Sequence, residues 1–284
     1  MAVVLFNPLS NNGRGRDEVE NIPGVDMAKV RYEDITKITN YHEFFETVGD
    51  DSVILSGGDG TLHNFANNIP EECLNKEIYY YPTGSGNDFA NDIEYKKGSE
   101  PVYLTDYLKN LPTVMLKGVK KKFLNDVGFG IDGYCCEKGD EARAKSSRPV
   151  NYTTIALKGL LYDYKPGKVH VEADGKVYDF DHVWMAPTMF GRFYGGGMMV
   201  TPMQNRNNPN HTMTVAIVHS KGRFALLKTF PRIFKGTHAS CSNVITFIEN
   251  VRHVTVEFEE PTSVQLDGET YLNVKTIEAK AATE

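Results

Sequence analysis

The first third of the chain alternates short apolar runs with amphipathic segments. Residues 2–6, 52–55 and 77–81 are β-rich runs in which apolar residues do not alternate with polar ones. Such runs are typical of parallel strands that are buried on both faces. Two intervening segments place apolar residues at helical spacing: Tyr41, Phe44, Phe45 and Val48, then Leu62, Phe65, Ala66 and Ile69. Strands that alternate with helices predict an α/β domain with a parallel sheet.

Beyond about residue 112 the pattern changes to short strands separated by Gly, Asn, Asp or Pro turns. The predicted strands are 113–126, 168–172, 176–186, 212–219, 244–248, 251–258 and 263–266, and helices are expected near 149–163 and 221–235. Residues 173–176 have the composition of a hairpin turn. This half is therefore predicted to be mainly antiparallel β. We place the domains at 1–115 and 116–273, and leave open whether 274–284 returns to the first.

Composition and charge restrict the classes of function. The 284 residues carry a net charge of −6, which argues against a nucleic-acid partner. No apolar run reaches the roughly 18 residues that a membrane-spanning helix needs. The N-terminus has no basic region before its apolar stretch, and the four cysteines have neither zinc-site nor CxxC spacing. We therefore expect reduced thiols and a cytoplasmic protein.

The strongest local motif is Ser56-Gly57-Gly58-Asp59-Gly60-Thr61, between a predicted strand and a predicted helix. Ligands of open α/β sheets bind outside the carboxyl ends of the strands. Glycines allow close approach of a polyphosphate, and the N–H groups of a helix N-terminus favour anions. An aspartate at this position can orient Mg²⁺ or accept a proton from a hydroxyl group. The alternative interpretation is a tight turn without a ligand.

Two further polar loops follow predicted strands. Pro82-Thr83-Gly84-Ser85-Gly86-Asn87-Asp88-Phe89 follows the next buried strand, and a loop that begins at Asn7-Pro8 follows the first. Asn87 and Asp88 either cap the following helix or bind ribose, metal or substrate. Three such loops after three strands are expected to converge on one crevice, which makes turns without a function a weaker explanation.

Two other nucleotide-binding signatures do not fit. The chain has no GxxxxGK[ST] sequence, so it is not a P-loop enzyme. A GxGxxG sequence occurs at Gly128–Gly133, but a dinucleotide fold would also need a βαβ unit with an acidic residue at the end of its second strand. We interpret these glycines as positions where the chain passes close to a nucleotide or to neighbouring backbone.

Taken in order, the motifs resemble those of the diacylglycerol kinase catalytic-domain family, which includes soluble bacterial lipid kinases and relatives of sphingosine and ceramide kinases. The motifs are Asn7-Pro8, Gly57–Thr61, Gly84–Phe89, Asn125–Asp132 and Asp267-Gly268-Glu269. The resemblance implies an N-terminal α/β domain like that of phosphofructokinase and NAD kinase, then a C-terminal β-sandwich domain. It also implies that ATP binds between the two.

The resemblance implies roles for individual residues. The residues expected to bind ATP are Asn7, Gly57, Gly58, Gly60, Thr61, Gly84, Ser85, Asn87 and Asp88. Asp59 would hold the catalytic Mg²⁺ through ATP, and Glu269 would act as general base toward a lipid hydroxyl, although Asp59 is also a candidate for the base. From the residues alone, Asp267-Gly268 is equally a plain hairpin turn.

The chain departs from the family in one segment. Relatives usually have an acidic pair where this chain has Thr201–Val215, and many bind a structural Mg²⁺ there. No carboxylate occurs from Thr201 to Val215. Because Mg²⁺ favours oxygen ligands that include carboxylates, we expect the second metal site to be absent.

The predicted function is ATP-dependent phosphorylation of a lipid hydroxyl, with diacylglycerol converted to phosphatidic acid. Two alternatives stay open: a kinase for NAD or a small alcohol, and a nucleotide-binding regulator without turnover. Residues 221–236 form a basic amphipathic segment that suits peripheral contact with the inner membrane face. A helix packed on the second domain with its charges in water explains this segment at least as well. The oligomeric state is left open, with a homodimer among the options.

Overall fold

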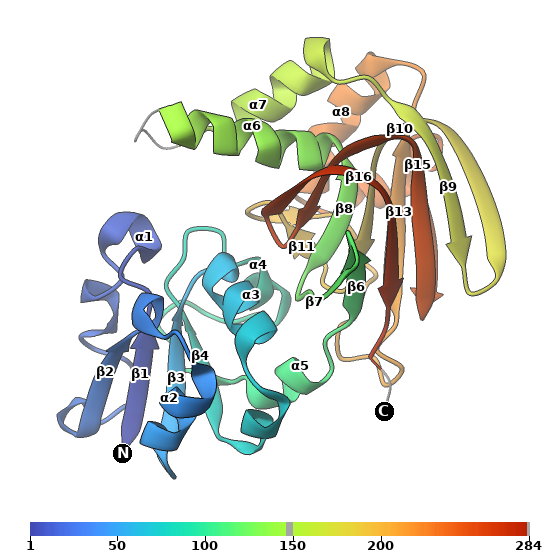
Figure 1. Cartoon of the computed structure of the whole chain (residues 1–284). Helices are drawn as coiled ribbons and strands as arrows, with labels where there is room; N and C mark the ends of the chain where they lie inside the picture. Colours follow the sequence, from blue (N-terminus) through green and yellow to red (C-terminus); the bar gives the residue numbers. More distant parts are fainter. Residues whose placement is uncertain (146–149, 283–284) are drawn as a thin grey trace. The chain divides into compact units, whose positions relative to one another are not determined.

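The computed structural model describes residues 1–145 and 150–282, which form two compact units, Met1–Leu111 and Pro112–Glu284 (Figure 1). The first unit ends at Leu111, close to the predicted boundary at residue 115. No helix among the described residues has the length and apolar character needed to cross a membrane.

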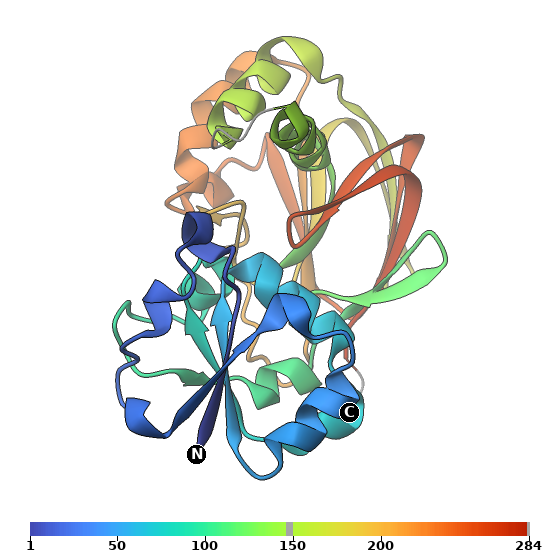
Figure 2. The same ribbon diagram turned by 60° about the vertical axis from the view of Figure 1, so that its left-hand side comes forward.

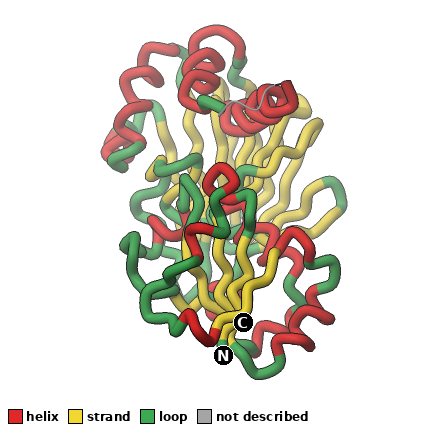
Figure 3. Tube along the Cα trace, turned by 90° about the vertical axis from the view of Figure 1, so that its left-hand side faces the viewer, coloured by secondary structure: helices red, strands yellow, loops and turns green. Residues whose placement is uncertain are grey.

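The first unit is built on a five-stranded sheet in the order β2-β1-β3-β4-β5. The strands are β1 (Ala2–Phe6), β2 (Val30–Asp34), β3 (Ser52–Gly57), β4 (Ile78–Pro82) and β5 (Val102–Tyr103). The first four are parallel, and β5 is antiparallel to β4. Figure 3 shows helices and loops on both sides of this sheet. The predicted α/β domain with a parallel sheet is confirmed.

The helices of the first unit bury the faces that the sequence pattern predicts. They are α1 (Ser10–Gly13), α2 (Tyr41–Val48), α3 (Asp59–Asn68), α4 (Asp88–Asp92) and α5 (Thr105–Lys109), with 3₁₀ turns at Asp17–Val19, Met27–Lys29, Ile35–Lys37 and Glu71–Asn75. Asn40 caps α2, since its Oδ1 accepts a hydrogen bond from the His42 N–H at 3.0 Å. All eight apolar residues predicted for the two core-facing stripes are buried.

The second unit contains a nine-stranded sheet, antiparallel throughout its recorded pairings. Its strands are β6 (Thr113–Leu116), β7 (Val119–Lys122), β8 (Asp126–Gly130), β9 (Gly167–Ala173), β10 (Lys176–Met189), β13 (Met213–His219), β14 (Ile245–Val251), β15 (His253–Leu266) and β16 (Glu269–Lys280). A separate two-stranded ribbon pairs β11 (Phe193–Tyr194) with β12 (Met198–Met199). The long strands β10 and β15 each pair with β9 along one half and with β8 along the other. Figure 2 shows the resulting strong bend of the sheet.

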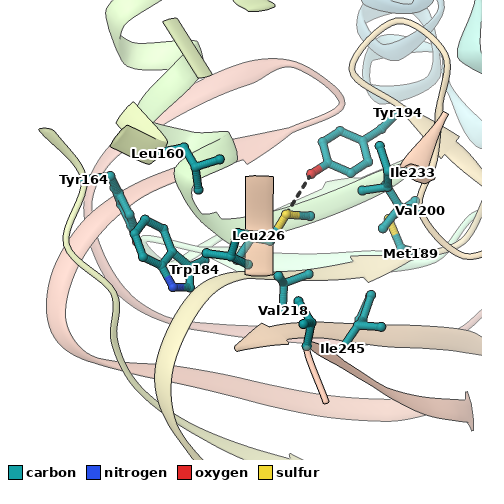
Figure 4. Close-up of a cluster of buried hydrophobic side chains, with 13 residues drawn as sticks. Leu160, Tyr164, Trp184, Met189, Tyr194, Val200, Val218, Leu226, Ile233 and Ile245 are labelled. Atoms are coloured by element: carbon teal, nitrogen blue, oxygen red, sulfur yellow. Dashed lines mark hydrogen bonds between the residues drawn. The ribbon is translucent and has the colours of Figure 1, made fainter. Parts of the chain in front are cut away.

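Three helices cover one end of this sheet: α6 (Ile131–Lys145), α7 (Tyr152–Lys158), which continues as a π-helical turn at Gly159–Asp163, and α8 (Arg223–Ile233). A 3₁₀ turn follows at Thr237–Ser240. Leu160, Leu226 and Ile233 join Trp184 and Tyr194 in one buried apolar cluster between helices and sheet (Figure 4). Burial of these side chains fixes α8 and the π-helical turn on the second unit.

Several predictions for this unit need correction. Segment 113–126 contains the hairpin β6–β7 and the start of β8 rather than one strand, because Lys117 and Gly118 form a turn with positive φ. The strands predicted at 251–258 and 263–266 are one strand with register shifts. Helix α6 was missed, since Gly133 and Gly139 interrupt its apolar spacing. Residues up to 282 do not return to the first unit, because β16 pairs with β15 and β6.

Candidate active site

Three loops meet at the carboxyl ends of neighbouring parallel strands in the first unit. Because β1, β3 and β4 are adjacent and parallel, the loops that follow them lie at one edge of the sheet. Asn7 joins the first loop to α3: its Nδ2 donates to Thr61 Oγ1 at 2.9 Å, and its Oδ1 accepts from the Leu9 N–H at 2.9 Å. The convergence predicted for these loops is present in the structure.

The loops after β3 and β4 touch through glycines. A Cβ atom placed on Gly58 would lie 3.0 Å from Gly84 Cα, and one placed on Gly84 would overlap Gly58 Cα. The Thr83 N–H and the Tyr80 hydroxyl both donate to the Gly57 carbonyl, each at 3.0 Å. Glycine is therefore required at 58 and 84 for the two backbones to pack together.

The Asp59 carboxylate connects these two loops. Its Oδ2 accepts a hydrogen bond from the Asp88 N–H and its Oδ1 from the Phe89 N–H, each at 3.0 Å. These N–H groups begin α4, so Asp59 caps that helix from a different loop. Asn87 stands at the N-cap position, but its side chain does not cap the helix, which corrects the local interpretation of that residue.

Asn87 shapes its own loop instead. Its backbone is left-handed, with φ at 53°. Its side chain folds back onto Gly84, where Oδ1 accepts from the N–H at 3.1 Å and Nδ2 donates to the carbonyl at 2.7 Å. Asp88 is buried, whereas Ser85 is exposed at the tip of the loop. Within this motif, the Asn87 side chain holds the backbone of Gly84 in place, and the hydroxyl of Ser85 is accessible to a ligand.

Helix α3 offers its N-terminus to the same edge. Gly58 is the N-cap residue and has no side chain with which to cap the first N–H groups. A Cβ atom added at Gly60 would meet nothing within 4 Å, so the space beside this exposed residue is open. A helix N-terminus with open space beside it suits a phosphate group, because its N–H dipoles favour negative charge.

Two buried hydroxyl groups beneath these loops were missed by the sequence analysis. Ser56 and Thr83 are 1% and 6% exposed, and their hydroxyl oxygens lie 3.1 Å apart. Ser56 lies next to the last residue of β3 and Thr83 directly follows β4, so the contact holds the two strand ends in register. Both residues lie inside the quoted motifs, but their pairing depends on strand order, which a single sequence does not give.

In the second unit the structure joins two motifs that are far apart in the sequence. The Asp267 carboxylate accepts hydrogen bonds from the N–H groups of Leu124, Asn125 and Asp126, at 2.8, 2.7 and 3.1 Å. Asp267 and Gly268 both have positive φ and form the predicted hairpin turn between β15 and β16. Glu269 is the first residue of β16 and is exposed.

The glycines of the GxGxxG sequence serve packing between strands. A Cβ atom on Gly130 would lie 2.6 Å from Met185 Cα, and one on Gly128 would overlap the Asp132 carboxylate. Strand β8 pairs antiparallel with β10 and β15. A dinucleotide turn needs a parallel βαβ unit, so the structure supports close backbone approach as the reason for these glycines.

Asp132 is a buried carboxylate at the end of the Asn125–Asp132 motif, and the sequence alone indicated no role for it. It is 7% exposed, and its Oδ1 accepts from the Gly133 N–H at 2.9 Å. Oδ2 is buried without a hydrogen-bond partner in the structure. Burial raises the pKa of Asp132 from 3.8 to about 7, because removal from water disfavours the charged form.

Segment 201–215 is held by amide and guanidinium groups. Gln204 Nε2 donates to the carbonyls of Phe190 and Thr212, at 3.2 and 2.7 Å. Arg206 is 5% exposed, and its Nη2 donates to Asn125 Oδ1 at 3.0 Å. Arg206 was not singled out from the sequence, although it is the one cation in this stretch of the printed sequence. These contacts supply no carboxylate, so this segment does not fit a structural Mg²⁺.

Asp59 is the residue predicted to hold a catalytic Mg²⁺ through ATP. Within residues 1–145 and 150–282, no group of three or more His, Cys, Asp or Glu side chains is arranged to hold a metal ion. Nucleotide-bound Mg²⁺ commonly takes only one or two protein carboxylates, together with phosphate oxygens and water. A carboxylate oxygen has more than one lone pair, so accepting one N–H does not exhaust its capacity as a ligand. The Asp59 carboxylate therefore fits such a role.

Comparison with known families agrees with these motifs. The diacylglycerol kinase catalytic domain matches residues 1–115, and the YegS C-terminal NAD kinase beta sandwich-like domain matches residues 125–279, more than half of the 284-residue chain. The chain belongs to the diacylglycerol kinase catalytic-domain family. The resemblance inferred from the motifs and the predicted two-domain fold are both confirmed.

Relatives of this kinase family match over most of the chain. A diacylglycerol kinase of Mycobacterium tuberculosis (strain ATCC 25618 / H37Rv) is 25% identical over 279 residues, which cover 93% of this chain and 87% of the relative. A diacylglycerol kinase of Bacillus subtilis (strain 168) is 24% identical over 231 residues, covering 77% and 71% of the two chains. A solved diacylglycerol kinase structure from Bacillus anthracis str. Sterne has a TM-score of 0.65 at 18% identity, covering 98% of this chain and 93% of the other, which supports the fold.

Proposed function

We propose that this member of the diacylglycerol kinase catalytic-domain family is a lipid kinase that transfers the γ-phosphoryl group of ATP to the hydroxyl group of diacylglycerol. The observation that carries the proposal is the contact between Gly58 and Gly84 beside the N-terminus of α3. It forms a backbone surface without side chains at the edge of a parallel sheet, which is where phosphates bind in such folds. The relatives that are named diacylglycerol kinases support the choice of acceptor.

The residues of the first unit would act mainly by positioning. The N–H groups at the start of α3 would hold phosphate oxygens, and Asn7 would keep Thr61 and the first loop in place through its 2.9 Å hydrogen bond. Asp59 would hold Mg²⁺, which would neutralise phosphate charge when bound. Phosphoryl transfer depends largely on such positioning and charge neutralisation.

Glu269 is proposed as the group that takes the proton from the acceptor hydroxyl. Its carboxylate is exposed, and its place directly after the Asp267-Gly268 turn is fixed by the hydrogen bonds of Asp267. Glu269→Gln keeps the size of the side chain but removes the base. We expect a loss of turnover of about a hundredfold or more, whereas Glu260→Gln, an exposed residue of β15, should leave the rate unchanged. Equal rates for the two variants would remove Glu269 from the mechanism.

The proposed function is tested with purified protein, Mg²⁺ and radiolabelled ATP in detergent micelles. Diacylglycerol, ceramide, sphingosine and undecaprenol are supplied in separate reactions, with a lipid-free control and reactions that contain NAD or glycerol. We expect labelled phosphatidic acid from diacylglycerol alone. Label on another lipid would replace the acceptor, and label on NAD or glycerol would refute the lipid kinase. Binding of ATP without transfer to any acceptor would refute the enzyme and favour a regulator.

A further inference from the structure

Exposed apolar side chains gather at the end of the second unit that is formed by α7, its π-helical continuation and α8. We call residues 152–163 and 221–235 the α7–α8 surface. Figures 1 and 2 both show the two helices side by side. Of the fourteen large apolar side chains that are exposed in the described chain, six lie here: Tyr152, Leu157, Leu161, Tyr162, Phe224 and Phe234. Exposed apolar side chains are thus concentrated on a small part of the chain.

These side chains point outward from elements that are firmly attached. Phe224 is 88% exposed and Tyr162 is 73% exposed, and α7 buries none of its residues. The neighbouring Arg223 guanidinium donates hydrogen bonds to the carbonyls of Leu160 and Tyr164. Leu226, one turn along α8, is in the buried cluster. The exposed aromatic rings are therefore held on a fixed base.

The charge around these rings is mainly positive, because the one carboxylate of the α7–α8 surface, Asp163, pairs with Lys158 at 3.3 Å. The printed sequence has no Asp or Glu from residue 182 to residue 248, in a chain whose net charge is −6. The cations of that stretch are Arg192, Arg206, Lys221, Arg223, Lys228, Arg232 and Lys235, and the last five belong to the α7–α8 surface. A segment of the second unit is therefore basic within an acidic protein, so electrostatic attraction to anions is concentrated here.

We propose that the α7–α8 surface docks the protein onto an anionic membrane, with Phe224 and Tyr162 inserted at the level of the lipid headgroups. This inference deepens the proposed function and rests on it for its purpose, since a lipid acceptor lies in a bilayer. Aromatic side chains favour the membrane interface, and each Lys or Arg near an anionic surface adds attraction. Cations around protruding apolar side chains are the usual composition of helices that lie on membranes.

The test measures co-sedimentation of the full chain with vesicles. One set contains phosphatidylcholine alone and the other contains phosphatidylcholine with about 30% phosphatidylglycerol. We expect binding to the anionic vesicles that weakens in 1 M NaCl, because salt screens surface charge. The double variant Tyr162→Ser/Phe224→Ser should bind at least tenfold more weakly. Lys228→Glu should also bind more weakly and lose most of the preference for anionic lipid.

A matched control uses exposed residues on the hairpin β9–β10. Lys176→Glu/Val177→Ser removes one cation and one apolar side chain, with Val177 57% exposed. This variant should bind as the wild type does. No binding of the wild type to anionic vesicles, or equal losses in the control and the α7–α8 variants, would overturn the inference and leave this surface to a protein partner.

Kinase activity separates this inference from the proposed function. With a short-chain diacylglycerol dissolved below its micellar concentration, the α7–α8 variants should keep the wild-type rate, while their rate on vesicle-embedded acceptor falls with binding. Vesicle binding without any lipid phosphorylation would uphold the docking surface and reject the kinase. If the surface variants phosphorylate vesicle-embedded lipid at the wild-type rate, the kinase would be upheld and the docking surface rejected.

Discussion

Asp59 in the first unit and Asp267 in the second each precede a glycine, and each carboxylate accepts backbone N–H groups from a distant segment. Their surroundings differ. The residues that supply these N–H groups are buried in both cases: Asp88 and Phe89 are 5% and 0% exposed, and Asn125 and Asp126 are 3% and 1% exposed. The difference is that Asp59 begins helix α3, whereas Asp267 lies in the hairpin turn between β15 and β16. The same interaction joins two loops beside a helix N-terminus in one unit and joins a hairpin turn to the start of β8 in the other. Substitution should therefore affect chemistry at Asp59 and stability at Asp267.

The largest effect is expected for Asp59→Asn. Asparagine keeps one oxygen, but it presents an NH₂ group to one of the two N–H groups of α4 and removes the negative charge. We expect kcat/KM for ATP-dependent transfer to fall by about a thousandfold or more, which corresponds to about 4 kcal/mol, with a stability loss of about 1 kcal/mol. Initial rates and urea denaturation measure the two effects. The exposed Asp106→Asn is the control, and an Asp59→Asn rate within tenfold of wild type would contradict the site assignment.

The second effect is the stability loss of Asp267→Ala. Removal of the carboxylate leaves three N–H groups without this acceptor, all of them in nearly fully buried residues. We expect a loss of about 3 kcal/mol in the free energy of unfolding. Asp174→Ala provides a matched control. Asp174 also precedes a glycine and accepts the N–H groups of Arg252 and His253, but at an exposed turn where water can replace it. Equal losses in the two variants would show that burial does not distinguish the two turns.

The third effect is a pH dependence of stability that arises from the buried carboxylate of Asp132. The pKa of Asp132 is about 7 in the folded protein, so the folded state keeps its proton after the unfolded chain has released it. The stabilising contribution is complete below the unfolded pKa near 3.8 and is lost as the pH rises through 7. From pH 5 to pH 7 the wild type should lose about 2 kcal/mol more than Asp132→Asn. Urea denaturation at several pH values measures this difference, and parallel pH profiles would contradict it.

The smallest effect is expected for Gly60→Ala. Alanine favours a helix over glycine, so α3 should gain about 0.5 kcal/mol or more. The added methyl group, however, would enter the open space beside the helix N-terminus. We expect ATP affinity to fall several-fold in isothermal titration calorimetry while the melting temperature stays or rises. Unchanged affinity would favour the interpretation of this motif as a turn without a ligand.

The sequence predicted those features that depend on local order. The apolar stripe from Tyr41 to Val48 and the Asp267-Gly268 turn are each determined by a few neighbouring residues, and both are present. Motif order also indicated the family. Helix α6 was not predicted, because Asp132, Gly133 and Gly139 are its buried residues and no apolar stripe marks it.

The partners within the candidate site could not be read from the sequence. Asp59 was singled out, but its contacts with the N–H groups of Asp88 and Phe89 depend on β3 and β4 being neighbours. The contact of Arg206 with Asn125 likewise joins residues that are separated by 81 positions. Such pairs follow from strand order and register, which a single sequence does not determine.

The long separation between Asp267 and the segment it binds also orders the events of folding. Asp267 lies more than 140 positions after Leu124, and the partners of β8 in the described part of the chain, β10 and β15, both come later in the sequence. During synthesis, the first unit has all its strands once Tyr103 has emerged, but the junction at Leu124 to Asp126 cannot close until residue 267 is available. Contacts this distant in sequence slow folding. Until then Val127 and Phe129 of β8 lack the partner strand β15, and strands with an unpaired edge are prone to associate with other chains.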